Sequence, residues 1–194
     1  MTLPHLLLRN RLALTRVTAI AIVAAYWLLR VQPALGALAG GTALVALGQG
    51  LRLWAAGHLV KRDVLTITGP FAHTRHPLYW GSTLSGLGLC VACRMWWSYL
   101  LVGAVFTLFY MPTLLDEEAW LRHTYGDAYR RYSEAVPRFG VRLRGYRGGE
   151  GPPSEARRFS WSRAFANGEH RTIAATLILL AALWLRLAVA GGAR

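Results

Sequence analysis

The chain has 194 residues, of which 54% are hydrophobic and only 16% are charged, and its formal net charge is +13 at pH 7. Long apolar runs with few charges inside them argue against a soluble domain and indicate an integral membrane protein. The net charge suggests a nucleic-acid partner, but no recognition motif accompanies it, so we expect no nucleic acid.

The apolar runs predict an all-α integral membrane protein with about five transmembrane helices. The expected spans cover residues 13–30, 34–57, 77–93, 95–115 and 172–190. Gly and Ser recur along the second and third spans, and such small residues let membrane helices approach closely. These two spans are therefore predicted to form the packed centre of the bundle.

Arginines are concentrated in alternate connecting segments. They precede the first span, follow the second and crowd the segment after the fourth, whereas the other loops and the C-terminus carry only Arg30, Arg94, Arg186 and Arg194. Because cytoplasmic loops carry the excess of basic residues, the N-terminus is predicted to be cytoplasmic and the C-terminus to lie on the other side. No signal-peptide cleavage pattern is evident near the first span, so we expect that span in the mature protein.

We interpret residues 1–194 as a single membrane domain with four parts. The parts are an N-terminal helix pair (1–57), a core with a hydrophobic hairpin at residues 77–115 (58–140), a cytoplasmic linker and interfacial segment (141–171) and a last transmembrane helix (172–190). Residues 145–154 are rich in Gly and Pro, which is typical of a flexible linker.

Cys90 and Cys93 have the spacing of a redox pair or of half a metal site. No second pair accompanies them and both lie in an apolar helix, where a free cysteine behaves as a small hydrophobe. Packing is therefore favoured, and we expect no metal.

Two polar clusters, residues 75–79 and Glu117-Glu118, bracket the hydrophobic hairpin. If both spans of the hairpin cross the bilayer, His76 and Glu117 return to the same membrane face. Polar groups at the edge of the apolar layer are costly, so they indicate a site. Pro77 suits the first turn of the third span, where the positive helix end favours an anion or the polar end of a ligand.

Several of these polar residues allow two interpretations each. His76 either caps a helix or binds a ligand, and the glutamate pair is either a solvated helix start or part of a site. Arg52 either snorkels to the membrane interface or lines the site.

Helical spacing makes two further predictions after residue 115. Glu118 and Arg122 stand one turn apart and are expected to pair. Tyr125, Tyr129 and Tyr132 share one helix face, which serves either packing or ligand contact.

Two sequence blocks carry a family resemblance. Residues 69–79 read GPFAHTRHPLY, like G-x-(Y/F)-x-x-x-R-H-P-x-Y, and residues 117–132 read EEAWLRHTYGDAYRRY, like E-E-x-x-L-x-x-x-F-G-x-x-Y-x-x-Y, with VPRF following at 136–139. In these blocks the chain resembles the bacterial type of the isoprenylcysteine carboxyl methyltransferase-like family of integral membrane methyltransferases. Residues 157–190 are similar to an extension seen in some bacterial members.

The resemblance implies an S-adenosylmethionine-dependent methyltransferase that acts in the membrane on a lipid or a lipophilic small molecule. It implies catalytic roles for Glu117 and His76. It also implies a larger set of cofactor contacts, namely Gly69, Phe71, His76, Pro77, Tyr79, Glu117, Glu118 and Tyr129. The chemistry of the donor agrees, because its carboxylate suits the helix start and the His76 ring, its amine and ribose suit Glu117, and its flat adenine suits aromatic side chains.

The chain departs from the carboxyl-methylating relatives at two places. Thr113 stands where those relatives have an arginine that holds the acceptor carboxylate, and residues 140–141 read GV where a proline is expected. A lipid amine, hydroxyl or thiol is therefore as good an acceptor as a carboxylate. We also expect Gly81, Ser85 and Gly88 to thin the third span and leave room for the acceptor's chain.

Two other functions stay open. The first is a membrane reductase that uses NAD(P)H, because sterol-reductase-type proteins share a similar C-terminal arrangement, although they are larger. The second is a non-catalytic membrane subunit that kept the fold. Binding of S-adenosylmethionine or of NADPH separates the three functions.

Overall fold

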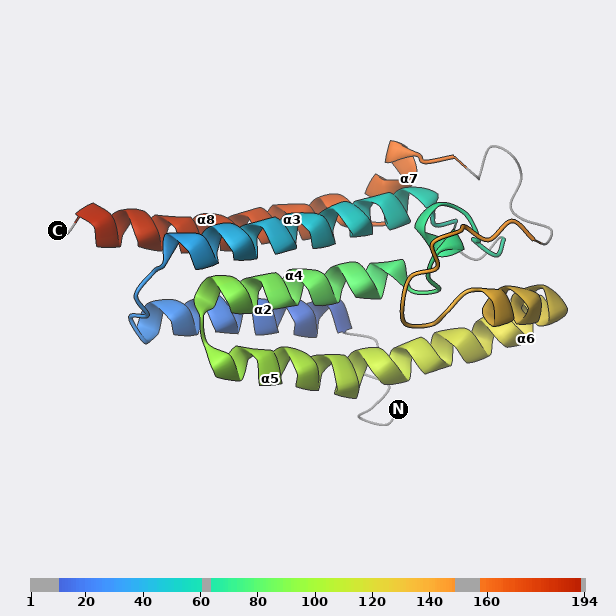
Figure 1. The fold of residues 1–194 in the computed structure, drawn as a ribbon, viewed down its shortest axis with the longest axis horizontal. Helices are drawn as coiled ribbons and strands as arrows, with labels where there is room; N and C mark the ends of the chain where they lie inside the picture. Colours follow the sequence, from blue (N-terminus) through green and yellow to red (C-terminus); the bar gives the residue numbers. More distant parts are fainter. Residues whose placement is uncertain (1–10, 61–63, 149–157, 193–194) are drawn as a thin grey trace. The chain divides into compact units, whose positions relative to one another are not determined.

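The computed structural model describes residues 11–60, 64–148 and 158–192, and within these residues it contains helices and no strand (Figure 1). The helices follow one another as α2 (Arg11–Leu28), α3 (Leu35–His58), η1 (Gly69–Ala72), α4 (Pro77–Cys93), α5 (Trp96–Val105), η2 (Phe106–Tyr110), α6 (Met111–Ala135), α7 (Trp161–Ala166) and α8 (Glu169–Gly192). The all-helical fold that the apolar runs predict is therefore confirmed.

Two helical stretches, Trp96–Ala135 and Glu169–Gly191, are long and apolar enough to cross a membrane, and a shorter apolar helix covers Ala13–Leu28. The chain is thus an integral membrane protein, as its composition predicts. The predicted spans 34–57 and 77–93 lie in α3 and α4, and the passage of these two helices through the membrane stays a prediction.

The helical run from α5 to α6 contains a π-helical turn, η2. Its backbone bond joins the N–H of Met111 to the carbonyl of Phe106, and Pro112 follows directly. Because proline has no N–H and its ring crowds the carbonyl four residues earlier, a widened turn fits better here than a regular one. The Thr113 hydroxyl donates to the Phe109 carbonyl at 2.7 Å, so this side chain is engaged with the backbone of the same turn.

The helices form two compact units, which we describe separately. The first unit comprises Met1–Gln49, Ser82–Thr113 and Arg171–Arg194, and the second comprises Gly50–Gly81 and Leu114–His170. Most of the apolar helical residues belong to the first unit, whereas both sequence blocks belong to the second. The interpretation of the chain as a single domain stays a prediction.

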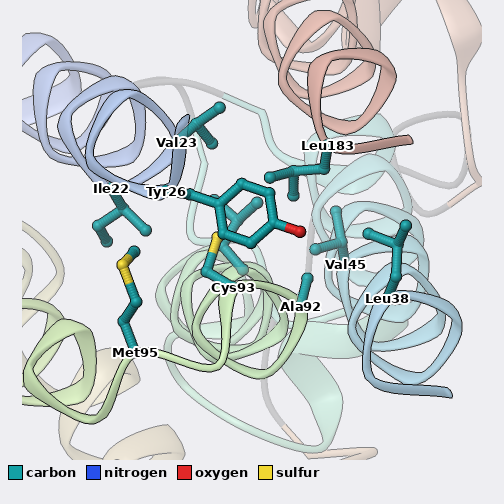
Figure 2. Packing of buried hydrophobic residues seen from close by; sticks show 10 residues of the cluster. Ile22, Val23, Tyr26, Leu38, Val45, Ala92, Cys93, Met95 and Leu183 are labelled. Carbon is teal, nitrogen blue, oxygen red and sulfur yellow. The ribbon is translucent and has the colours of Figure 1, made fainter. Parts of the chain in front are cut away.

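The first unit is built around one apolar cluster, in which Tyr26 of α2 lies among side chains from α3, α4 and α8 (Figure 2). The cluster consists of Ile22, Val23, Tyr26, Leu38, Val45, Leu89, Ala92, Cys93, Met95 and Leu183. Both cysteines are free and buried, and Cys93 belongs to the cluster. The cysteine pair therefore serves packing, as the apolar surroundings of its sequence predict.

Helices α3 and α4 approach each other closely through two glycines. A Cβ added at Gly41 would lie 2.5 Å from the Gly88 carbonyl oxygen, and one added at Gly88 would lie 2.7 Å from the Gly41 oxygen. The small residues of these helices thus do form a packed centre. The expectation that Gly88 leaves room for an acceptor chain is wrong, because the backbone of α3 fills the space that this glycine provides.

Helix α6 is broken at Gly126, which has φ 49° and ψ −122°. A residue with a Cβ rarely adopts this conformation, whereas glycine does so at little cost. The glycine after Tyr125 in the second sequence block is therefore required by a change in helix direction. This backbone break was not expected from the helical spacing of the tyrosines, which treats the segment as one straight helix.

Replacing Gly126 with alanine is expected to lower the free energy of unfolding by about 1–3 kcal/mol, because the Cβ penalises the required backbone conformation. Gly103 is the matched control. It lies inside α5 with nothing near its added Cβ and no positive φ, so Gly103→Ala should be neutral or stabilising by up to about 1 kcal/mol. Thermal unfolding in detergent measures both, and equal stability of the two variants would contradict the strain argument.

Candidate functional site

The second unit contains every residue that the sequence motifs single out. They lie on the 3₁₀-helix η1, directly before and at the start of α4, and along α6, namely Gly69, Phe71, His76, Pro77, Tyr79, Glu117, Glu118 and Tyr129. The two blocks are distant in the sequence, and side-chain contacts join them. The structure shows how these residues are arranged, whereas their roles in ligand binding stay predictions.

Glu118 is buried and forms the centre of a charged cluster. Its carboxylate lies 2.9 Å from His76 Nε2, 3.0 Å from Arg75 Nη1 and 2.6 Å from Arg138 Nη2. The hydrogen bond with Glu118 raises the pKa of the Arg138 guanidinium. Glu118 pairs with these three residues rather than with Arg122, because burial turns the carboxylate toward cations from other segments and away from the helix surface.

This cluster, which we call the Glu118 clamp, holds three segments together. Arg75 and His76 come from the loop before α4, Arg138 comes from the segment after α6, and Glu118 comes from α6 itself. One carboxylate with three basic partners tolerates burial because each of its oxygens accepts hydrogen bonds from charged donors. The clamp therefore fixes the segments that surround the adjacent carboxylate of Glu117.

Glu117 differs from Glu118 in its surroundings, although the two residues are adjacent. Glu117 is exposed, and the Tyr79 hydroxyl donates to its Oε2 at 3.1 Å. Tyr79 is itself buried. Of the two glutamates, Glu117 is thus the one whose carboxylate reaches solvent and is accessible to a ligand.

His76 stands immediately before α4, which begins at Pro77 as predicted. Its backbone carbonyl accepts hydrogen bonds from the N–H groups of Tyr79 and Trp80 at 3.1 and 3.2 Å. Its ring lies edge-on to Tyr79, with 5.6 Å between ring centroids. His76 therefore does cap the helix through its backbone, while its side chain belongs to the Glu118 clamp.

The 3₁₀-helix η1 supplies Gly69 and Phe71. Gly69 has φ 60°, and a Cβ there would lie 2.6 Å from atoms of the His58 ring. The position thus requires glycine for both conformation and space, independently of any ligand. The Phe71 carbonyl accepts a hydrogen bond from the Tyr132 hydroxyl at 2.7 Å, which ties η1 to α6.

The tyrosine face of α6 serves packing at two of its three positions. Tyr129 and Tyr132 are buried in a cluster with Leu65, Ile67 and Val136. Tyr125, the third tyrosine of this face, is partly buried and packs against this cluster. Packing therefore accounts for most of the stripe, and a ligand contact from Tyr129 stays a prediction.

The segment after α6 returns to the loop before α4. The backbone N–H of Arg75 donates to the Pro137 carbonyl at 3.1 Å, and the N–H of Tyr146 donates to the Ala72 carbonyl at 2.9 Å. Residues 145–154 were expected to form a flexible linker, but Tyr146, near the start of this segment, is held against the protein by this hydrogen bond. Residues 149–154 lie outside the described residues.

Arg52 of α3 is buried and forms an ion pair with Glu169 of α8, with 2.7 Å between Nη2 and Oε1. The snorkelling interpretation is therefore wrong. Glu169 was not among the residues predicted to be functional, although the sequence contains a signal for it. A carboxylate at the start of an apolar span needs a cationic partner, and Arg52 is an arginine inside another span.

Comparisons with known proteins bear on the same residues. Residues 37–128 match the family model described as phospholipid methyltransferase. A protein-S-isoprenylcysteine O-methyltransferase of Schizosaccharomyces pombe is 32% identical over 103 residues, which cover 53% of this chain and 44% of that protein. The cobalt-zinc-cadmium resistance protein CzcN of Cupriavidus metallidurans is 28% identical over 158 residues, which cover 75% of this chain and 70% of that protein.

This chain thus spans less than half of the Schizosaccharomyces pombe protein. No solved structure matches the chain significantly. Among the described residues, no group of three or more His, Cys, Asp or Glu could hold a metal ion. The matched segment includes the first sequence block and both glutamates, but it ends before Arg138 and before α7 and α8. Residues 37–128 are therefore similar to the phospholipid methyltransferase family, and the resemblance of the chain to isoprenylcysteine carboxyl methyltransferase-like membrane methyltransferases is confirmed.

Proposed function

We propose that this chain is a membrane methyltransferase that uses S-adenosylmethionine to methylate a lipophilic acceptor. The observation that carries the proposal is the contact between the two sequence blocks, in which His76 meets Glu118 and Tyr79 meets Glu117 within one unit. The family match and the name of the Schizosaccharomyces pombe relative support the reaction type.

The residues present fit this donor. The second unit contains buried polar atoms that have no hydrogen-bond partner among the described residues, including the hydroxyls of Thr68 and Thr74 and the Nε of Arg75. Buried polar atoms without partners are uncommon in native proteins and point to a missing ligand or water. A donor with a carboxylate, an amine and ribose hydroxyls offers complementary groups.

The proposed roles follow from the charges and the burial. The positive end of α4 and the cations of the Glu118 clamp favour the carboxylate of the donor. The exposed carboxylate of Glu117, held by Tyr79, is suited to the amine or the ribose hydroxyls. When bound, S-adenosylmethionine supplies an electrophilic methyl group. The residues of the chain then hold the reactants in alignment and exclude water.

Titration of the purified full chain in detergent tests the proposal. Calorimetry should detect binding of S-adenosylmethionine and no binding of NADPH. Binding of NADPH alone would support the membrane reductase, and binding of neither would support a non-catalytic subunit.

We further propose that the acceptor head is neutral or cationic. Thr113 replaces the acceptor-binding arginine of carboxyl-methylating relatives, and a threonine provides no cation for a carboxylate. The Thr113 hydroxyl is also engaged already, because it donates to the Phe109 carbonyl. With labelled donor, lipids with amine or hydroxyl heads should be methylated better than prenylcysteine analogues. Preferential methylation of a prenylcysteine carboxylate, or of a small water-soluble acceptor, would contradict this acceptor class.

We propose that the N-terminus and both ends of the hairpin 77–115 lie on the cytoplasmic side, because the arginines are distributed that way. The resemblance to the bacterial type of the family supports a bacterial inner membrane as the location. Arg94 and Arg147 are both exposed and suit cysteine labelling. In a variant that lacks the two buried native cysteines, Arg94→Cys should react from the outside and Arg147→Cys only from the inside. Labelling of both from one side would contradict the topology.

A further inference from the structure

The part of the chain beyond the family match folds onto the last turns of α3. The Asn167 side-chain amide donates to the carbonyls of Ala56 and Leu59 at 2.8 and 3.1 Å. The backbone N–H of Ser160 donates to the Gly57 carbonyl at 3.0 Å. The segment 158–169 therefore satisfies carbonyls that the end of α3 leaves without helical partners.

The Arg52–Glu169 ion pair at the end of this segment is buried. Arg52 Nη2 and Nε lie 2.7 and 3.2 Å from the two Glu169 oxygens, and the two side chains are 9% and 5% exposed. Burial of two charges is costly unless the geometry is good and further hydrogen bonds complete it. The two-point contact provides that geometry, and the position of Glu169 in the first turn of α8 adds a favourable helix-end interaction.

Arg52 also contacts the start of α4. Its Nη1 donates to the Leu78 carbonyl at 3.4 Å, and Leu78 lies in the first turn of that helix. The next residue, Tyr79, donates to Glu117. A continuous set of contacts within the second unit thus leads from Glu169 through Arg52 to the exposed carboxylate of Glu117.

We propose that Glu169 and Arg52 are positioning residues for the donor site, so that the C-terminal segment fixes the first turn of α4 and thereby Tyr79 and Glu117. This inference rests on the proposed function. It assigns a role in donor binding to the part of the chain after residue 128, which the family match does not include. Glu169 touches no donor itself and acts only through Arg52.

The test compares donor affinity and stability in the full chain. Glu169→Gln removes the charge with little change in shape, so Arg52 loses its ionic partner and its hold on Leu78 relaxes. Calorimetry should then report donor affinity about tenfold weaker than in the parent chain, the size typical of coupling through intermediate residues. The double variant Arg52→Glu with Glu169→Arg does not restore the contact to Leu78, and it should bind donor as poorly as Glu169→Gln.

Leu183→Ala is the control for a purely structural effect. Leu183 is fully buried in the core of the first unit, so its truncation should lower the melting temperature while leaving donor affinity unchanged. A double-mutant cycle that combines Glu169→Gln with Tyr79→Phe tests whether the coupling passes through Tyr79. If Glu169 acts through Tyr79, the combined variant should lose less affinity than the product of the two single losses.

The outcomes separate this inference from the proposed function. If the parent chain does not bind S-adenosylmethionine, the proposed function fails. If the parent chain binds and Glu169→Gln binds equally well, or if Leu183→Ala loses as much affinity at the same loss of stability, the positioning role is overturned. Should Glu169→Gln not fold, Glu169→Asp keeps the charge with a shorter reach and should weaken donor affinity severalfold. Unchanged affinity in that variant overturns the inference as well.

Discussion

Replacing Glu118 with glutamine should destabilise the protein by about 3–5 kcal/mol, because removal of one member of a buried charge cluster leaves the others without compensation. Arg75 and His76 are the partners most affected, since both are largely buried. Arg138 is 36% exposed on its side chain, so water replaces part of its lost contact. Thermal and chemical unfolding in detergent measure the loss.

The adjacent glutamate provides the matched control. Glu117→Gln should leave the free energy of unfolding nearly unchanged, because Glu117 is exposed and its described contact is with the Tyr79 hydroxyl. Donor affinity should fall roughly ten- to a hundredfold, since a hydrogen bond to a charged group contributes about 1.5–3 kcal/mol. His76→Ala should lower both stability and affinity, because its ring belongs to the Glu118 clamp. Equal destabilisation by the two glutamine variants would contradict this separation of roles.

Replacing Gly41 with alanine should destabilise the first unit by about 1–3 kcal/mol, as overpacking of a close contact typically does. The new Cβ would lie 2.5 Å from the Gly88 oxygen and 2.6 Å from the Ala92 nitrogen. Both are backbone atoms of α4, so relief requires the helices to move apart. Loss of melting temperature and of folded protein in the membrane fraction measures the effect.

Gly40 is the control for this change, because it is the neighbouring residue in the same helix and nothing lies within 4 Å of its added Cβ. Gly40→Ala should be neutral or stabilising by up to about 1 kcal/mol, since alanine favours a helix more than glycine does. Similar melting temperatures for the two alanine variants would mean that α3 and α4 do not approach each other through Gly41.

The local sequence was sufficient to predict the helices and to identify the candidate site residues. Apolar runs predicted where the long helices lie, and Pro77 predicted the start of α4. Residue order also placed Glu117 and Glu118 near the end of the hairpin. These features depend on composition and on neighbours in the chain, and such information is present in the sequence itself.

The pairing of the charged residues depends on the folded arrangement of distant segments. Helical spacing predicted a pair within α6, whereas Glu118 binds Arg75, His76 and Arg138 from other segments. Periodicity reports only neighbours on one helix, and a buried carboxylate selects its partners by the geometry of the folded chain.

The same limit applies to Arg52, to the glycines of α3 and to the break in α6. Arg52 pairs with Glu169, which lies 117 residues further along the chain, and no local pattern joins two such positions. Gly40 and Gly41 are identical neighbours in the sequence, yet only Gly41 faces the backbone of another helix. Local sequence patterns were enough to predict the helices and the polar residues of the site, whereas packing between distant segments determines which of those residues are structural and which remain accessible to a ligand.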